Sequence, residues 1–392
     1  NAQSSRVEGM ALQGDYIKDY TSIYSYPSSI SHVGNLVYGE FGGGSDRAVG
    51  AVLGNLWEGR LGTWGVHLRQ WEPNLGQATM NSHPGIGVGG QDLNANPNHS
   101  FDLMWGKRAG GTSIGVRVNR SFSEFEQSTA TTSFVTNGAD TNVFARNVFG
   151  VGFGVGFEVN PSSMFEVGVL WQSRTFENTL APIGGGTNSS EDSPTSYQLA
   201  ARLMWQWQPN VLVVPVFKWY SFDYAYKTTT GSLTSVRSAD QKGWQIGVAG
   251  NWTLNQNDLF VLGVTAAQNT FEQDTEVFTD PLDPSDDFSK IEESIMPQVF
   301  AALETHVNPW LTIRFGATND ANVTIKGTPF TGSATPTTKA TGADFNMQLG
   351  AGVKVGGLQF DAIMASDFYN RFTQLSSEDA PTFGKVTATY AF

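Results

Sequence analysis

The sequence predicts an all-β protein, namely a transmembrane, up-and-down antiparallel β-barrel of about sixteen strands. Large apolar residues alternate with glycine from Phe149 to Phe157, and similar alternation recurs along the chain. Short turns and longer polar loops follow each other between the alternating segments. The final segment also alternates, and it ends on Phe392. Together these features indicate strands that cross a membrane and return.

The alternation gives each segment two different faces. Successive side chains of a strand point to opposite sides, so residues 163–177, 195–208, 243–254 and 345–355 each carry one apolar and one polar face. The polar faces are rich in Gly, Gln and Asn. A soluble all-β sandwich or propeller is the alternative, but its strands are usually shorter and its wet face carries more charge. The pattern therefore favours lipid outside and an enclosed polar interior.

The expected strands, in chain order, are 33–41, 47–57, 61–71, 99–107, 112–127, 142–159, 163–177, 193–208, 211–227, 239–254, 258–273, 290–307, 309–325, 341–355, 357–372 and 380–392. The first two are the weakest, which leaves fourteen strands as the alternative. An even number returns both chain ends to the side of the short turns, as in single-chain bacterial barrels. Long polar loops are expected at about 72–98, 128–141, 178–192, 228–238, 274–289, 326–340 and 373–380.

Composition restricts the class of protein further. The chain has 392 residues, no cysteine, only 15% charged residues and a net charge of −13. No apolar run of the length that a membrane-spanning helix needs is present, which excludes a helical bundle. The acidic balance argues against nucleic acid as a partner. Because the chain starts at Asn1 without an apolar leader, we expect a signal peptide to have been removed from a Gram-negative outer-membrane protein.

The last strand places Tyr390 and Phe392 on its outward face. This ending resembles the C-terminal signal of bacterial outer-membrane barrels, and the resemblance implies recognition by the barrel-assembly machinery. Outer-membrane lipid and lipopolysaccharide are the other expected partners of the outer face. The sequence is compatible with a homo-oligomer or with membership in a larger surface complex.

Residues 1–32 do not alternate, so we expect an N-terminal segment at 1–32 and a barrel at 33–392. Arg6 and Gly9-Met10 precede an acidic and aromatic stretch at 19–24 and the sequence Y-P-S-S-I at 26–30. This order resembles the start of the FadL-like (long-chain fatty-acid transporter) superfamily, although that family usually has Asn-Pro-Ala where Tyr-Pro-Ser stands here. The resemblance implies a fourteen-stranded barrel, an N-terminal hatch in the lumen and an apolar cargo that leaves sideways through the wall.

Glycines form the inward face of the segment that follows Phe149. They are Gly150, Gly152, Gly154 and Gly156. Consecutive glycines on one face create a shallow trough against which something bulky can pack, and residues 9–30 are the nearest candidate. The alternative is that these glycines only let the strand bend as the barrel closes.

The residues that alternate with the apolar ones should point inward, and several of these inward positions, which would line the pore, carry charge. They are Arg69, Arg117, Arg146, Arg174, Arg202, Lys218, Arg314, Asp102, Glu304, Asp361 and Asp367. One interpretation is a basic strip facing an acidic wall, which would produce a transverse field across the pore. The other is local pairing, such as Glu304 with Arg314 and Glu166 with Arg202.

Enzyme chemistry is not indicated, and neither a metal site nor a cofactor is expected. The acidic loop 274–289 can be a calcium site or a solvated loop, and loop 72–98 can be a constriction or a surface loop. The leading functional prediction is a channel for passive diffusion of small hydrophilic solutes. The alternatives are a FadL-like transporter of hydrophobic molecules and a barrel that anchors a surface complex.

Overall fold

The computed structural model describes residues 5–42, 47–54, 56–57, 59–69, 99–133, 136–181, 188–192, 195–230, 233–255, 258–277, 285–328, 338–364 and 383–392. The predicted loops 72–98 and 373–380 lie outside these residues. Among the described residues, the helices are too short or too polar to span a bilayer.

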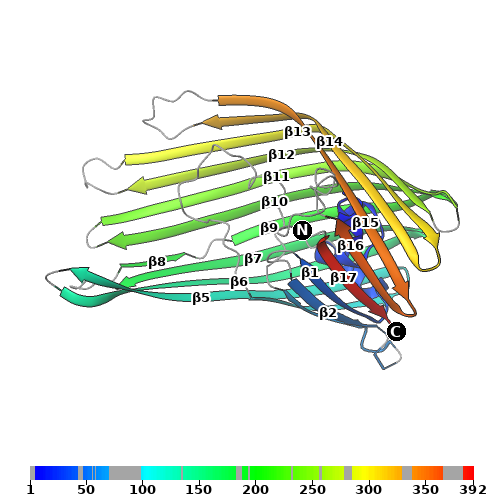
Figure 1. Cartoon of the computed structure of the whole chain (residues 1–392), viewed down its shortest axis with the longest axis horizontal. Helices are drawn as coiled ribbons and strands as arrows, with labels where there is room; N and C mark the ends of the chain where they lie inside the picture. The colour runs from blue at the N-terminus through cyan, green and yellow to red at the C-terminus, as the bar shows by residue number, and fades with distance from the viewer. Residues whose placement is uncertain are drawn as a thin grey trace, which may run out of the picture.

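Strands make up most of the described chain (Figure 1). They are β1 (Leu36–Gly42), β2 (Arg47–Leu53), β3 (Thr63–Arg69), β4 (His99–Ala109), β5 (Thr112–Ser133), β6 (Thr136–Asn160), β7 (Ser163–Ala181), β8 (Asn188–Asp192), β9 (Thr195–Gln208), β10 (Val211–Thr230), β11 (Leu233–Thr253), β12 (Leu259–Val277), β13 (Ser285–Asn308), β14 (Leu311–Thr328), β15 (Thr338–Val355), β16 (Leu358–Met364) and β17 (Phe383–Ala391). The N-terminal segment contains α1 (Ser5–Glu8) and three short 3₁₀ helices, η1 (Gly14–Tyr16), η2 (Tyr20–Tyr24) and η3 (Pro27–His32).

The sheet closes on itself, because β1 pairs with both β2 and β17. All neighbouring pairs are antiparallel. The short β8 does not add a position to the wall, since β8 and β9 continue one register along β7: Phe176 faces Asp192 and Ser173 faces Thr195. The barrel therefore has sixteen strand positions, which confirms the predicted fold and count and makes the alternative of fourteen wrong.

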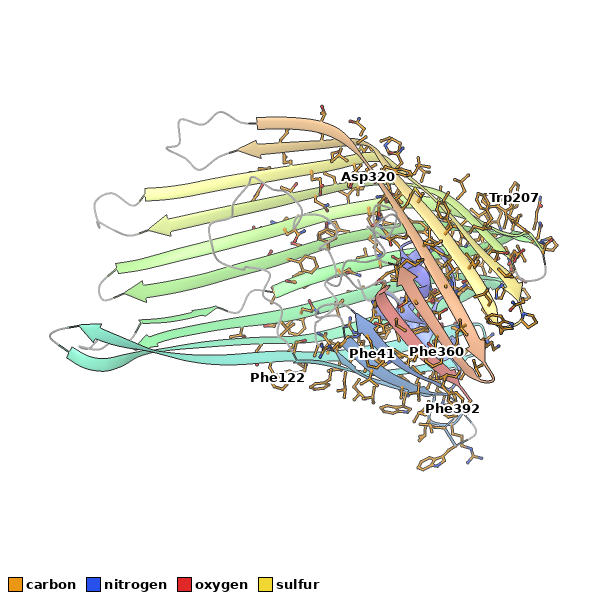
Figure 2. All side chains as sticks on the ribbon, in the orientation of Figure 1. Phe41, Phe122, Trp207, Asp320, Phe360 and Phe392 are labelled. Carbon is orange, nitrogen blue, oxygen red and sulfur yellow. The ribbon has the colours of Figure 1, made fainter. Side chains whose placement is uncertain are left out.

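The faces follow the predicted parity. Phe149, Phe153 and Phe157 are 41–50% exposed, whereas the glycines between them are buried. Figure 2 shows Phe41, Phe122 and Phe360 on the outer side of the wall, where they form part of an apolar belt. An exposed apolar belt around a closed sheet is the arrangement of an outer-membrane β-barrel.

The strands extend further than the sequence pattern predicts, and this corrects most of the expected loops. Residues 128–133, 136–141, 178–181, 188–192, 228–230, 233–238, 274–277, 285–289, 326–328 and 338–340 are strand. The physical reason is that both faces of a hairpin meet water beyond the bilayer. The backbone ladder continues there without any alternation of apolar residues.

The wall is uneven in height (Figure 1). Strands β5, β6 and β13 have 22, 25 and 24 residues, whereas β1, β2, β3 and β16 have seven each. The N-terminal segment lies inside the barrel, toward the rim where the connections are short, and Figure 1 shows it beside β15, β16 and β17. In barrels of this class the short-turn rim faces the periplasm.

Local sequence explains the turns of the N-terminal segment. The carboxylate of Asp19 accepts a hydrogen bond from the backbone N–H of Thr21 and so caps η2. Pro27 occupies the first position of η3, where its missing N–H is tolerated. These short turns let the segment follow the inner wall instead of crossing it as one rod.

Candidate functional site

The N-terminal segment is seated on glycines of the inner wall. A Cβ atom on Gly154 would lie 2.6 Å from the backbone nitrogen of Ser28, and a Cβ on Gly115 would overlap the carbonyl of Pro27. A Cβ on Gly168 would likewise overlap the carbonyl of Ser25. Gly150, Gly152 and Gly156 are buried on the same inner face. The close approach of backbone to backbone therefore depends on residues without side chains.

Arg6 links the segment to β13 and, through Glu304, to β14. Its Nε and Nη2 atoms donate to the two oxygens of Glu304 at 2.9 and 2.8 Å. Arg314 donates to Glu304 and to Asp361 at 2.6 Å each. Burial is the largest single influence and opposes the charge of Arg6, but the hydrogen bond to Glu304 and the negative charges of Glu304, Asp19 and Asp361 together outweigh it, so the pKa of Arg6 is raised. The bidentate geometry makes this a directional contact.

A second ionic cluster connects the segment with β7, β9 and β10. Lys218 donates to the carboxylate of Asp15. Arg202 donates to Glu166 at 2.8 Å, to the carbonyl of Asp15 at 3.2 Å and to the hydroxyl of Ser29 at 3.3 Å. Ser29 in turn donates to the other oxygen of Glu166. Wall charges are thus shared between strand partners and the N-terminal segment.

A third cluster surrounds Tyr24 near β1, β3, β4 and β5. A hydrogen bond joins its hydroxyl to Nδ1 of His67, and the guanidinium of Arg69 lies 3.8 Å from the centre of its ring. Asp102 forms ion pairs with Arg117 at 2.7 Å and with Arg69 at 3.6 Å. The face of the Tyr24 ring therefore contacts an arginine whose charge is paired with Asp102, and a cation over an aromatic face is a favourable arrangement.

The start of the segment contacts the last strand. Lys385 on β17 donates to Glu8 at 2.9 Å, and it lies 3.6 Å from Glu40 on β1. The Ser5 hydroxyl lies 2.6 Å from the hydroxyl of Thr387. The N-terminal segment therefore bridges the seam at which the barrel closes.

Most charged residues assigned to the interior from parity are buried on the inner face. They are Arg69, Arg117, Arg202, Lys218, Arg314, Asp102, Glu304 and Asp361. The side chains of Arg146 and Arg174, and all of Asp367, lie outside the part of the chain that the structure describes. The expected pairs Glu304–Arg314 and Glu166–Arg202 are both present.

The sequence reasoning missed the partners on the N-terminal segment. Asp15, Glu8 and Tyr24 belong to the site, as does His67 on β3. Inward parity does place His67 in the lumen, but no periodic pattern assigns a wall partner to residues of a non-alternating segment. The described side chains include no group of three or more His, Cys, Asp and Glu that could hold a metal ion.

An apolar cluster fills the space between the N-terminal segment and β10–β13. It consists of Val7, Met10, Leu12, Tyr16, Ile17, Val214, Val216, Ala249, Val261, Phe300 and Ala302. The ring of Tyr16 lies 5.0 Å from that of Phe300, centre to centre. A Cβ on Gly247 would overlap the hydroxyl of Tyr16, so the tyrosine lies directly behind β11. The inner wall therefore has an apolar patch among its paired charges.

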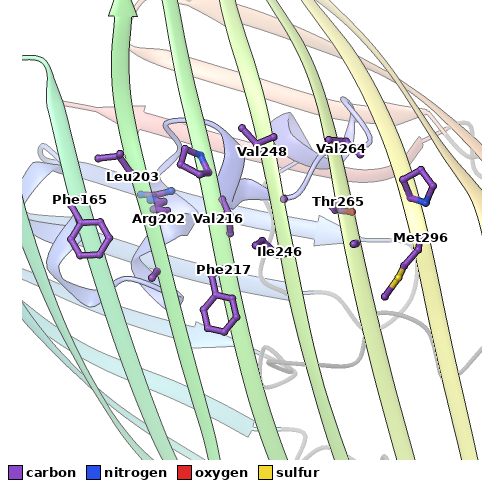
Figure 3. A pocket seen from close by; sticks show the side chains of 15 residues that line it. Phe165, Arg202, Leu203, Val216, Phe217, Ile246, Val248, Val264, Thr265 and Met296 are labelled. Carbon is purple, nitrogen blue, oxygen red and sulfur yellow. The ribbon is translucent and has the colours of Figure 1, made fainter.

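A pocket of about 700 Å³ opens in the outer face of the wall at the same place. Its lining side chains include Phe165, Leu203, Phe217, Ile246, Val248, Val264 and Met296. Figure 3 shows this pocket across β7 and β9–β13, with the N-terminal segment behind the strands. Arg202, Val216, Gly247 and Thr265 also line it, although they belong to the inward set. The pocket thus reaches into the thickness of the wall.

The hydrogen-bond ladder is irregular around this pocket. Between Val213 and Val216 the described β9–β10 register has no pair, and Pro215 in this gap has no N–H to donate. Ile295 and Gln298 on β13 pair with Ala267 and Thr265 on β12, so β13 has one more residue than β12 between these two pairs. Such a bulge bends the strand locally and leaves backbone groups out of the ladder. The ladder is thus interrupted at a place where apolar side chains lie on both faces of the wall.

Comparisons with known proteins give structural likenesses only. No family model matches the chain, and no curated protein matches it. A TodX ΔS2S3 mutant, described as a monoaromatic hydrocarbon channel, is 10% identical over 100% of this chain and 99% of that chain, with a TM-score of 0.46. The Ralstonia pickettii toluene transporter TbuX is 10% identical over 100% and 98%, with a TM-score of 0.44. A Pseudomonas aeruginosa FadL homologue is 10% identical over 100% and 98%, with a TM-score of 0.38.

Proposed function

We propose that the chain is an outer-membrane transporter of small apolar molecules, closed at rest by its N-terminal segment. Residues 5–33 act as a hatch, and the cargo passes between the lumen and the bilayer at the wall pocket. The observation that carries this proposal is the position of the pocket, which lies opposite the apolar cluster around Tyr16.

Occupancy of the lumen supports a gated route. The hatch contacts β1, β3–β7, β9, β10 and β13–β17 through buried polar bonds and close backbone packing. Charged side chains that an open aqueous pore would present to solvent are instead paired, and Arg117, Arg202 and Arg314 are at most 3% exposed. These contacts favour the hydrophobic-transporter alternative over a water-filled channel for hydrophilic solutes.

The chemistry of the pocket supports apolar cargo. A membrane-facing surface is apolar in every barrel, but a cavity that enters the wall at a ladder break is not needed for membrane insertion. An apolar molecule leaving the Val216–Tyr16 side would meet Gly247 and then the side chains of Ile246 and Val248, with little polar surface to desolvate. The same path would be costly for a sugar or an ion.

The test measures two cargoes on one protein. Purified barrel in liposomes is assayed for toluene transfer and for swelling in a hydrophilic sugar. We expect toluene transfer without sugar-dependent swelling. The Ala266→Phe variant fills the pocket and should reduce transfer several-fold, whereas Val169→Phe, on the outer face of β7, should leave it unchanged.

Two outcomes would contradict the proposal. Sugar-dependent swelling without toluene transfer would favour the hydrophilic channel. The absence of both activities from a correctly folded barrel would favour an anchoring role. Folding of each variant is checked by its heat-dependent shift in gel mobility.

A further inference from the structure

The connection between β2 and β3 differs from the other described turns at the short-turn rim. It runs from Gly54 to Gly62, with residues 55 and 58 outside the described set, whereas β4–β5 and β9–β10 are joined by two residues each. Trp57 has a positive φ of 50° and its side chain is 77% exposed. A large apolar side chain that is this exposed, on a strained backbone conformation, is favoured at a binding surface or at a membrane interface.

Hydrogen bonds fix where this turn lies. The carbonyl oxygen of Leu61 accepts from the indole nitrogens of Trp64 at 3.0 Å and Trp105 at 2.8 Å. The ammonium of Lys107 donates to the carbonyl of Arg60 at 3.1 Å. Trp64, Trp105 and Lys107 have outward parity on β3 and β4, opposite to the buried His67, Asp102 and Met104. The turn is therefore held against the outer face of the wall and not beneath the lumen.

The turn and the strand ends form what we call the Trp–Lys patch, defined as Trp57, Arg60, Leu61, Trp64, Trp105 and Lys107. Arg60 and Lys107 are exposed, and neither forms an ion pair with a carboxylate among the described residues. The neighbouring Arg108 differs, because it pairs with Glu158. Glu58 belongs to the same turn but lies outside the described residues. Among the described residues the two adjacent exposed cations have no counter-ion, which in a chain of net charge −13 favours an anionic ligand.

The surface above the patch has the complementary property. Val66, Leu68, Phe101 and Leu103 continue the outward faces of β3 and β4 and are 40–54% exposed. A ligand that fits both regions carries an anionic group at the rim and apolar chains along the wall. That description fits a phospholipid with its headgroup at the rim, and it does not fit free phosphate.

We propose that the Trp–Lys patch binds the headgroup of an anionic phospholipid from the periplasmic leaflet, with the acyl chains lying along β3 and β4. Arg60 and Lys107 supply the charge complementarity. Trp57 and the Leu61-bound indoles occupy the interface between headgroup and chains, where amphipathic aromatic rings are favoured. The lipid site is independent of the hatch and of the cargo route.

Native mass spectrometry tests the site with the full chain in detergent, titrated separately with phosphatidylglycerol and phosphatidylethanolamine. The wild type should retain phosphatidylglycerol preferentially. The double variant Arg60→Gln/Lys107→Gln should lose about fivefold in affinity for each charge removed, hence roughly 25-fold in total, and Trp57→Ala should weaken both lipids. Lys354→Gln is the matched control, because Lys354 is an exposed rim lysine outside the patch and close to the end of β15.

Equal phosphatidylglycerol affinity in the wild type and the double variant would overturn the proposal. So would equal affinities for inorganic phosphate and phosphatidylglycerol, since that would mean that the acyl chains contribute nothing. The substituted side chains are exposed, and the heat-dependent gel shift verifies that each variant is folded.

Discussion

Replacing Arg202 by Met tests whether buried ion pairs hold the hatch closed. The side chains of Arg202 and Glu166 are 2% and 0% exposed, and their charges lie 2.7 Å apart. Removing one partner of a buried pair leaves the other charge unpaired, which typically costs about 3–5 kcal/mol. Arg202 also donates to the Asp15 carbonyl and to Ser29, so part of this cost falls on docking of the hatch.

If the whole cost opposes docking, the population of the undocked hatch rises roughly 150- to 5,000-fold, because each tenfold change corresponds to about 1.36 kcal/mol. Hydrogen exchange of residues 14–30, followed by mass spectrometry, measures this opening directly. Single-channel recording should show more frequent openings of the same variant.

The pair can also be removed as a unit, which provides the control. Arg202→Met/Glu166→Gln leaves no unpaired charge and should recover most of the protection, since replacing both partners is often close to neutral. Lys242→Met breaks an exposed ion pair with Asp240 and should change the free energy of opening, as obtained from hydrogen exchange, by less than about 1 kcal/mol. Unchanged protection of residues 14–30 in Arg202→Met would refute the role assigned to this cluster.

Three further predictions concern the glycines under the N-terminal segment, a rim turn and assembly. Gly154→Val should displace η3, because a Cβ at this position would lie 2.6 Å from the Ser28 nitrogen. Proteolysis of residues 5–33 should therefore accelerate. Gly342→Ala should behave like the wild type, because nothing lies within 4 Å of a Cβ there. Hydrogen bonds from the His306 amide, Asn255 and Thr305 lower the pKa of Asp258, so their contribution to stability is present above the carboxyl's usual pKa and is lost as pH falls through the lowered value. Melting curves of the wild type and Asp258→Asn should therefore differ at pH 6 and converge under strong acid, and a constant difference would argue against this account. Phe392→Ala removes a ring that is 59% exposed and stacked on Tyr390; it should reduce the yield of heat-modifiable barrel in the outer membrane without changing synthesis, and an unaltered yield would contradict the predicted part of this aromatic pair in assembly.

The alternation of side chains was enough to predict the wall but not its full height. From Phe149 to Phe157 the predicted outward residues are exposed or partly exposed and the glycines are buried, because lipid imposes one polarity on each face. Beyond the bilayer that constraint ends. Residues 128–133 and 136–141, expected as a loop, therefore belong to β5 and β6 without a periodic signal.

Only the part of the site that belongs to the barrel wall was predictable from the sequence. Inward parity identified Arg202 and Glu304, and the expected ion pairs followed from their cross-strand positions. Their contacts with Arg6 and Asp15 could not be derived, because the hatch has no repeating pattern that sets its path. The glycines at 115, 154 and 168 lie where the N-terminal segment packs against the wall. Glycine in a strand is equally compatible with simple bending, so the sequence alone does not reveal this packing.

The bond between Ser5 and Thr387 joins positions 382 residues apart. Lys385 next to it holds Glu8 and approaches Glu40 on the first strand. An emerging polypeptide cannot make these bonds until β17 has been delivered to the membrane. Closure of the barrel and docking of the N-terminal segment are thus coupled, and a chain without β17 would lack the contacts that hold Ser5 and Glu8.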